Sequence, residues 1–302
     1  MTFDQIYNSA SKWIKRNARP LECARWAYLF ESGTQEDVIH KLEAFQNEDG
    51  GFGHGLEPDI TMPDSSAIAT WTACQILMEV DVVHDHPIVQ KTIHYLVDSY
   101  DSELGYWWTV TPNFNDHAHA PHWAYRENVQ ENWMFNPSVE LAAYVIHWSA
   151  PASEAAQIGW AVIEKAKERL LTCETMDFHE INNYQRAIQL LKHEIEDAGL
   201  LQQKVKTLAY NAMNKDPETW GKTYSALPLD LISSKEDELY KENSKLVQQN
   251  IDYYIQAVQE DGIWGLTWSW GQYDDHFQIA KQQWKGILAV RYVKLIKALG
   301  RN

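Results

Sequence analysis

The chain has 302 residues, of which 45% are hydrophobic and 23% are charged, and its net charge at pH 7 is −16. This length suffices for a large hydrophobic core. The acidic balance argues against nucleic acids and anionic membranes as partners, because like charges repel. The three cysteines Cys23, Cys74 and Cys173 are far apart, as expected of free thiols in a reducing compartment. With no signal-peptide pattern and no window of 18 apolar residues, we expect a cytoplasmic protein without integral membrane association.

Apolar residues recur at intervals of three and four along most of the chain, which is the period of an α-helix. The pattern predicts twelve helices, over residues 3–16, 20–31, 35–46, 64–80, 87–100, 137–149, 152–172, 180–194, 197–213, 225–234, 236–259 and 276–299. We expect Asp64 or Ser65 to cap the fourth helix, and Asn136-Pro137 to supply the cap and first residue of the sixth. Residues 108–135 have no period and form a long irregular loop, a type of segment that is often functional.

A glycine-rich turn separates the third and fourth predicted helices. It reads Gln46-Asn47-Glu48-Asp49-Gly50-Gly51-Phe52-Gly53, and weaker copies occur around Gly105-Tyr106-Trp107 and Gly262-Ile263-Trp264. Repeated helix–turn–helix units predict a closed ring of helical hairpins. The first helix of each pair carries charges and the second is apolar on most sides, so the second should be buried. The sequence therefore predicts an all-α protein with a single domain over residues 1–302. It is expected to be an (α/α)6 toroid of two concentric helix rings.

These turns resemble the repeats of the terpenoid cyclase and protein prenyltransferase toroid superfamily. The family pattern is a glutamine followed after a few residues by Asp-Gly-Gly-Phe or Gly-x-Trp, which Gln46–Gly53 matches and Gln259–Trp264 matches in part. The resemblance implies a toroid enzyme acting on an isoprenoid. The acidic and zinc-binding motifs of the family do not occur in this chain, so we expect acid–base chemistry rather than ionisation of a diphosphate.

Two segments offer side chains for proton transfer. His54, Glu57 and Asp59 directly follow the best-matching turn, and Asp275 and His276 lie at the start of the last predicted helix. Histidine and carboxylate side chains are the usual general acids and bases. We therefore predict these five residues as catalytic, with helix capping as the competing structural explanation for the acids.

Other residues are candidates for substrate binding. Tryptophans cluster after the glycine turns, where aromatic rings can wall a pocket or stack on a sugar. Three polar candidates come from the irregular loop and from the helix at 180–194. The predicted binding residues are Trp107, Trp108, His119, His179, Arg186, Trp264, Trp268, Trp270 and Tyr273.

The histidines of the irregular loop also allow a weaker hypothesis. His117, His119 and His122 could chelate a divalent metal, although a surface cluster is the better explanation because zinc needs three or four ligands and a supporting second shell. We therefore predict no metal site and no cofactor.

Three functions remain open on this evidence. The first is a terpenoid cyclase-like or prenyltransferase-like enzyme with an aromatic-lined pocket for an isoprenoid. The second is a carbohydrate-active (α/α)6 hydrolase or lyase, and the third is a toroid that binds a peptide or protein without catalysis. A deep dry cavity would favour the first, an open site with paired acids the second, and a filled mouth the third.

Overall fold

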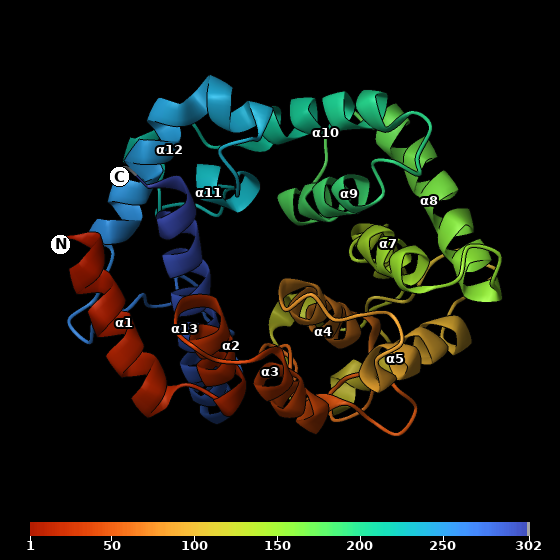
Figure 1. Ribbon diagram of the computed structural model, residues 1–302, viewed down its shortest axis with the longest axis horizontal. Coiled ribbons are helices and arrows are strands. Elements are labelled where there is room, and N and C mark those ends of the chain that lie inside the picture. Colours follow the sequence, from red (N-terminus) through yellow and green to blue (C-terminus); the bar gives the residue numbers. More distant parts are fainter. Residues whose placement is uncertain (301–302) are drawn as a thin grey trace. The chain divides into compact units, whose positions relative to one another are not determined.

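The computed structural model describes residues 1–300, and they form an all-α protein (Figure 1). The longer helices are α1 (Phe3–Asn17), α2 (Pro20–Phe30), α3 (Gln35–Leu42), α4 (Ala67–Glu79), α5 (Pro87–Asp98), α7 (Ser138–Trp148), α8 (Glu154–Thr172), α9 (Phe178–Leu190), α10 (Ala198–Ala212), α12 (Glu238–Gln256) and α13 (Asp274–Leu299). The short helices are α6 (Gln130–Trp133) and α11 (Pro228–Leu231), and 3-10 turns are η1 (Glu43–Phe45), η2 (Pro112–Asp116), η3 (Pro121–Trp123) and η4 (Pro217–Thr219). Within residues 1–300 the only β-type pairing consists of isolated bridges, so the all-α prediction is confirmed.

Each of the twelve predicted helices has a counterpart, although the one predicted over 225–234 is reduced to the short α11 and α6 lies in the segment predicted as a loop. Two of the predicted caps are wrong. Helix α4 begins at Ala67 because the hydroxyl of Ser66 accepts a hydrogen bond from the Ala69 amide at 3.2 Å, so the N-cap is neither Asp64 nor Ser65. Helix α7 begins at Ser138, with Pro137 as its N-cap. The predicted cap residue Asn136 is used elsewhere, since its side chain accepts a hydrogen bond from Asn183 at 2.7 Å.

The chain divides into two compact units. The first unit contains Met1–Lys41, Ala209–Ser269 and the chain from Phe277 onward. The second unit contains Leu42–Leu208 and the short segment Trp270–His276. Each unit is described by itself below.

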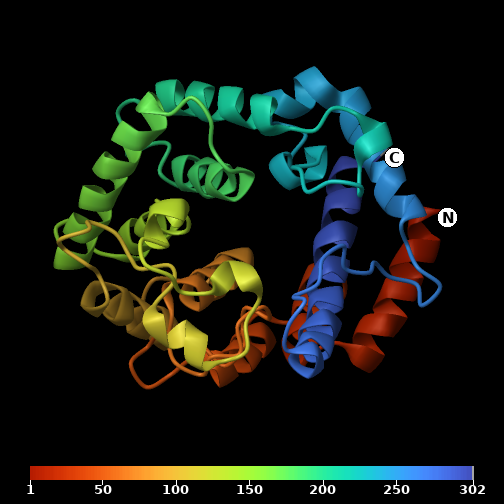
Figure 2. The same cartoon turned by 180° about the vertical axis from the view of Figure 1, so that it is seen from behind.

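Helix α7 forms the centre of the second unit. It packs against α4, α5, α8 and α9, and Figures 1 and 2 show α4, α7 and α9 side by side. Residues 138–145 of α7 are all buried, as its apolar sequence predicts, whereas α8 keeps Glu164 and Glu168 exposed. The difference between apolar and charged helices therefore corresponds to burial within this unit.

The glycine turn before α4 is held by its own polar side chains. Gln46 donates from Nε2 to the carbonyl oxygens of Gly50 at 3.0 Å and Ile88 at 3.2 Å, which ties the turn to α5. Asp49 accepts hydrogen bonds from the Gly51 amide at 2.9 Å and the Ser65 hydroxyl at 2.7 Å. The conspicuous glutamine and aspartate of this motif are thus used in building the turn.

The aromatic residues of the weaker turn copies have a structural role of the same kind. The indole N–H of Trp107 donates to the carbonyl of Leu96 in α5 at 2.7 Å, and that of Trp264 donates to the carbonyl of Tyr254 in α12 at 2.7 Å. The two residues are only 1% and 2% exposed. Each turn therefore uses a buried tryptophan to satisfy a carbonyl in the last turns of the preceding helix.

The first unit has an aromatic core and few buried charges. Trp26 is fully buried in α2, and its ring lies 5.4 Å from that of Tyr7 in α1 and 4.6 Å from that of Phe30. The buried carboxylate of Glu22 is paired with Arg19 at 2.7 Å.

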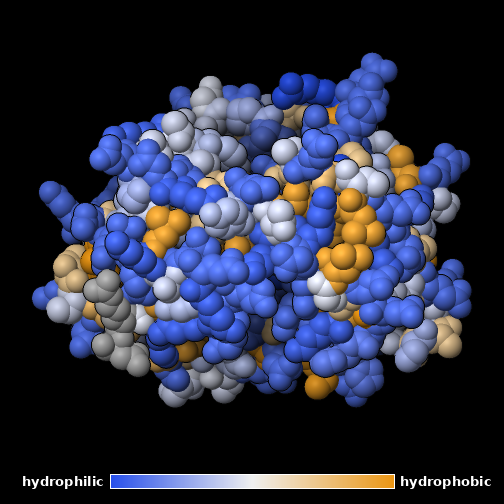
Figure 3. Space-filling view, turned by 90° about the horizontal axis from the view of Figure 1, so that it is seen from above, coloured by the Kyte–Doolittle hydropathy of each residue, from blue (hydrophilic) through white to orange (hydrophobic). Residues whose placement is uncertain are grey.

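None of the helices in residues 1–300 is both long and apolar enough to cross a membrane. The face drawn in Figure 3 is largely hydrophilic, with separate apolar patches.

Candidate acid–base site

Three segments that are far apart in the sequence meet in the second unit. They are residues 54–61 after the glycine turn, residues 117–122 of the irregular loop, and the segment Trp270–His276. The indole N–H of Trp270 donates to Oδ1 of Asp59 at 2.8 Å, across 211 positions of the chain. Gln272 donates from Nε2 to the carbonyl of His119 at 3.0 Å. The predicted catalytic residue Asp59 and the predicted binding residues His119 and Trp270 are therefore brought together.

The first two segments pair through their backbones. Ile60 and His119 form an isolated antiparallel bridge, the Ala120 amide donates to the carbonyl of Asp59 at 2.9 Å, and the Thr61 amide donates to that of Ala118 at 3.0 Å. Asp59 and His119 are each 4% exposed. The pairing holds a buried carboxylate and a buried imidazole in one rigid piece of irregular structure.

His119 has a defined hydrogen-bonding state. Its Nδ1 lies 2.7 Å from the carbonyl oxygen of His117, which can only accept, so Nδ1 carries the proton. In the neutral ring the lone pair is then on Nε2. The hydrogen bond at Nδ1 orients the ring of His119 and leaves Nε2 as the acceptor. Catalytic and ligand-binding histidines are commonly oriented in this way.

The other predicted acids and histidines divide into two groups. Glu57 is 8% exposed and accepts a hydrogen bond from the Asp59 amide at 3.3 Å, so it lies beside Asp59. His54 is exposed and points to the glycine turn, where its Nε2 lies 2.8 Å from Oδ1 of Asn47. Its positive φ of 54° and that of Gly55 at 70° make the sharp bend between the turn and Glu57.

The start of α13 supplies exposed groups next to this cluster. The ring of Tyr273 lies 5.8 Å from that of His119 and 6.4 Å from that of His276. Tyr273, Asp275 and His276 are all exposed to solvent. Asp275 lies in the first turn of α13, where its charge also favours the helix dipole, so the capping explanation and the functional one remain compatible.

His122 joins the cluster through its electrostatics. Although the residue is exposed, loss of water around the ring lowers the pKa of His122 below its ordinary value of 6.5. The negative charge of Asp59 acts in the opposite direction and raises this pKa, while the positive charges of His179 and His119 lower it. The charges of Asp59, His119 and His179 therefore all act on the ring of His122.

A titration tests this arrangement. We expect the pKa of His122, followed by its Hε1 proton in NMR spectra, to lie below 6.5 and to fall further in Asp59→Asn, because the charge that raises it is removed. Folding disfavours the charged ring, so its contribution to stability is present above pH 6.5 and is lost as the pH falls through the lowered pKa. The exposed Asp64→Asn is the matched control, and His94 on α5 is the internal reference. An unchanged or higher pKa in Asp59→Asn would contradict the arrangement.

A second polar centre contains a residue that we did not predict. Glu140 on α7 is fully buried, and its carboxylate accepts hydrogen bonds from Trp71 at 2.7 Å, Gln75 at 3.1 Å, the Tyr144 hydroxyl, and Nε of Arg186 at 2.7 Å. The same carboxylate and the burial of the ring raise the pKa of Tyr144. A single acid in an otherwise apolar helix, Val139-Glu140-Leu141-Ala142-Ala143, was the available signal.

The predicted binding residues His179 and Arg186 both lie on α9, which begins at Phe178. His179 is exposed, Asn183 is buried and donates to the His179 carbonyl at 2.9 Å, and the side chain of Arg186 is 44% exposed. The guanidinium carbon of Arg186 lies 5.9 Å from the centre of the Trp71 ring. On this helix, Arg186 is paired with the buried Glu140 at 2.7 Å.

The remaining predicted aromatic residues do not contribute to this cluster through any contact described above. Trp107 is buried in the turn after α5, and Trp108 is exposed with its indole N–H bound to Asp101 at 2.8 Å. Trp264 and Trp268 belong to the first unit, where Trp268 packs edge-on against Trp284 at 5.3 Å. The structure thus gives Trp107 and Trp264 a packing role, and we leave these four out of the candidate site.

The metal hypothesis finds no ligand set. In the part of the chain that the structure describes, no three His, Cys, Asp or Glu side chains are arranged to hold a metal ion. His117, His119 and His122 therefore do not form a chelating group.

A small apolar cavity of about 10 Å³ lies among α7, α8 and α9. It is lined by residues such as Val139, Ile163 and Leu170, and none of its lining residues belongs to the acid–base cluster.

Comparisons of the chain with models of protein families, with curated proteins and with solved structures give no match. The site is therefore classified by its own geometry. It is a cluster of buried carboxylates and histidines in an all-α protein, accompanied by a half-exposed arginine on a buried glutamate.

Proposed function

We propose that the second unit carries the acid–base site of an enzyme, a hydrolase or lyase that acts on a saccharide. The observation that carries this proposal is the hydrogen bond from Trp270 to Asp59, because it orients a buried carboxylate next to His119. Positioned carboxylates and histidines are the groups that transfer protons in such reactions. Asp59 is assigned the proton transfer, with Glu57 as the neighbouring carboxylate.

His122 is assigned the part of proton acceptor. Its lowered pKa keeps the ring neutral near pH 7, which is the form that can accept a proton. The exposed groups Tyr273 and His276 are assigned to substrate contacts at the same cluster, since both are open to solvent. Proton transfer by a well-placed group typically accelerates a reaction by about 10²–10⁴.

A polar substrate agrees better with this cluster than an isoprenoid does. The proposed contact groups are carboxylates, imidazoles and a phenol, which can hydrogen-bond to a polar substrate but not to a hydrocarbon chain. Trp107 and Trp264, the expected walls of a hydrocarbon pocket, are buried and hydrogen-bonded to helix carbonyls. These observations favour the carbohydrate-active hypothesis over the cyclase-like one.

The ring arrangement of the helices is part of the same proposal. The support for an (α/α)6 toroid is the succession of helices along the chain and the glycine turns before α4, after α5 and after α12, as the repeat resemblance implies. A crystal structure of the full chain tests it directly, and an open arc of helices would refute it.

A substrate screen tests the proposed activity. The full chain is incubated with neutral and acidic oligosaccharides, and with squalene and geranylgeranyl diphosphate as isoprenoid probes. We expect products from a saccharide only, and a loss of at least about 100-fold in kcat for Asp59→Asn. The control Asp64→Asn removes an exposed acid five positions after Asp59 and should keep full activity. Isoprenoid turnover, full activity of Asp59→Asn, or the absence of any product would overturn the proposal.

A further inference from the structure

Arg186 combines a fully buried acidic partner with a side chain that is half open to solvent. Its Nε is held at 2.7 Å by Glu140, a carboxylate with no solvent exposure, while 44% of the arginine side chain remains open to solvent. Three further donors, from Trp71, Gln75 and Tyr144, fix that carboxylate in turn. A guanidinium held from behind by a buried, fully engaged acid has its planar fork oriented before any ligand arrives.

Arg186 shares the polar face of α9 with His179. The two residues are seven positions apart, which corresponds to about 10 Å along a helix. Asn183 lies between them and bonds to both, donating to the His179 carbonyl at 2.9 Å and accepting from Arg186 at 3.5 Å. This face therefore offers an imidazole, an amide and a guanidinium along one side of the helix.

We infer that Arg186 binds the carboxylate of an acidic saccharide, so that the substrate is a uronic-acid glycan lying along α9. The inference rests on the proposed function and specifies its substrate class. Arginine matches a carboxylate through two parallel hydrogen bonds, which a neutral sugar cannot supply. The ring of Trp71, 5.9 Å from the guanidinium carbon, gives the same place an aromatic surface.

The overall charge makes such a preference informative. A net charge of −16 repels anions in general, so non-specific binding of an acidic glycan is disfavoured. Tighter binding of an acid than of its neutral counterpart must then come from a local cation. At an ionic strength of 0.15 M the long-range repulsion is screened beyond about 8 Å, while a direct contact with Arg186 is screened much less.

The test is a binding measurement with two probes that differ in whether the uronate carboxyl groups are ionised or methyl-esterified. Trigalacturonate and its methyl ester are titrated by calorimetry into the full chain carrying Asp59→Asn, which prevents turnover. We expect the free acid to bind at least tenfold more tightly than the ester. Adding Arg186→Met should bring the two affinities to within twofold, and Arg186→Lys should retain part of the difference because it keeps the charge but not the fork.

Two controls keep the result interpretable. Arg186→Met leaves the buried Glu140 without its cation, so the double variant Arg186→Met/Glu140→Gln provides a neutral replacement if the single variant does not fold. Arg126→Met removes an exposed arginine of the irregular loop and should leave the preference unchanged. Equal binding of both probes, binding of neither, or a tenfold preference that survives in the double variant would refute the inference.

The outcome is distinguishable from that of the activity screen. Turnover of neutral glycans without any preference for trigalacturonate would leave the proposed function standing and remove this inference. A preference that depends on Arg186, with no turnover of any saccharide, would establish the binding site and refute the enzymatic function.

Discussion

Replacing Glu140 by alanine is expected to lower the free energy of unfolding by about 3–5 kcal/mol, the range observed when one partner of a buried ion pair is removed. Glu140 has no solvent exposure and accepts from Trp71, Gln75, Tyr144 and Arg186. The substitution leaves several donors without an acceptor at the centre of the second unit. Each buried donor left unsatisfied costs about 1–3 kcal/mol, although Arg186 can turn to water because it is half exposed.

Urea unfolding followed by circular dichroism measures this effect. The matched control is Glu164→Ala on α8, because Glu164 is exposed and its pairing with Lys167 at 3.2 Å is a surface ion pair. Such pairs contribute about 0–1 kcal/mol, so the control should unfold close to the unmodified chain. A loss below about 1 kcal/mol for Glu140→Ala would mean that the network does not form as described.

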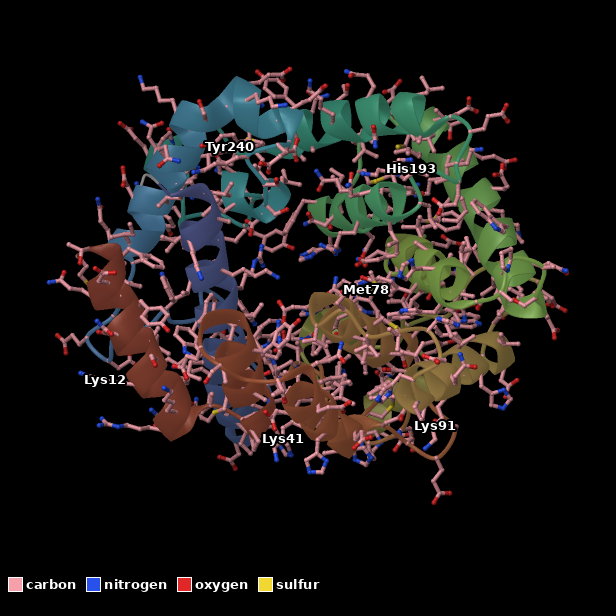
Figure 4. The ribbon with its side chains drawn as sticks, in the orientation of Figure 1. Lys12, Lys41, Met78, Lys91, His193 and Tyr240 are labelled. Carbon is pink, nitrogen blue, oxygen red and sulfur yellow. The ribbon has the colours of Figure 1, made fainter. Side chains whose placement is uncertain are left out.

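The same substitution, glycine to alanine, should have opposite signs at Gly50 and Gly199. At Gly50 the backbone φ is +90°, and a Cβ atom would lie 2.1 Å from the backbone carbonyl oxygen of Lys91. Figure 4 labels Lys91, which lies on α5. The neighbour is backbone and cannot rotate away. Strain of about 1–3 kcal/mol from the positive φ adds to an overpacking penalty of similar size, so we expect a loss of about 2–6 kcal/mol.

Gly199 lies in the first turns of α10, and nothing lies within 4 Å of the Cβ it would gain. Alanine is a better helix former than glycine by up to about 1 kcal/mol, so Gly199→Ala should stabilise the protein or leave it unchanged. Thermal unfolding of the two variants in parallel checks both signs. If Gly50→Ala were tolerated as well as Gly199→Ala, the turn would have to adopt another conformation.

The acid–base cluster was predictable in part. The sequence predicted His54, Glu57 and Asp59 as site residues because they follow a glycine-rich turn. It also predicted residues between Trp270 and His276, because aromatic residues, acids and a histidine are close together there. The pairing of Asp59 with Trp270 was not predictable, because no local pattern reports a contact across 211 positions. The orientation of His54 was not predictable either, since its ring bonds to Asn47 although Glu57 and Asp59 follow it by only three and five positions.

Glu140 and the tryptophans also show that local sequence does not identify the contact partners of a residue. Glu140 stands in an apolar helix, a pattern that says the residue is buried but does not say which donors meet it. Trp107 and Trp264 are aromatic residues beside glycine turns, and nothing local distinguishes a ring that faces a ligand from one that donates to Leu96 or Tyr254. Burial and hydrogen-bond partners depend on distant segments, so they follow from packing alone.

The amino-acid sequence by itself determined the all-α class, the twelve helices and the sharp glycine turns. These depend on periodicity, capping and backbone freedom, which act over a few residues. Only the tertiary structure decided the caps of α4 and α7, the structural use of Trp107 and Trp264, the union of Asp59 with His119 and Trp270, and the support of Arg186 by Glu140. The reason is physical, because each of these outcomes is a competition among side chains for partners that folding brings from elsewhere in the chain.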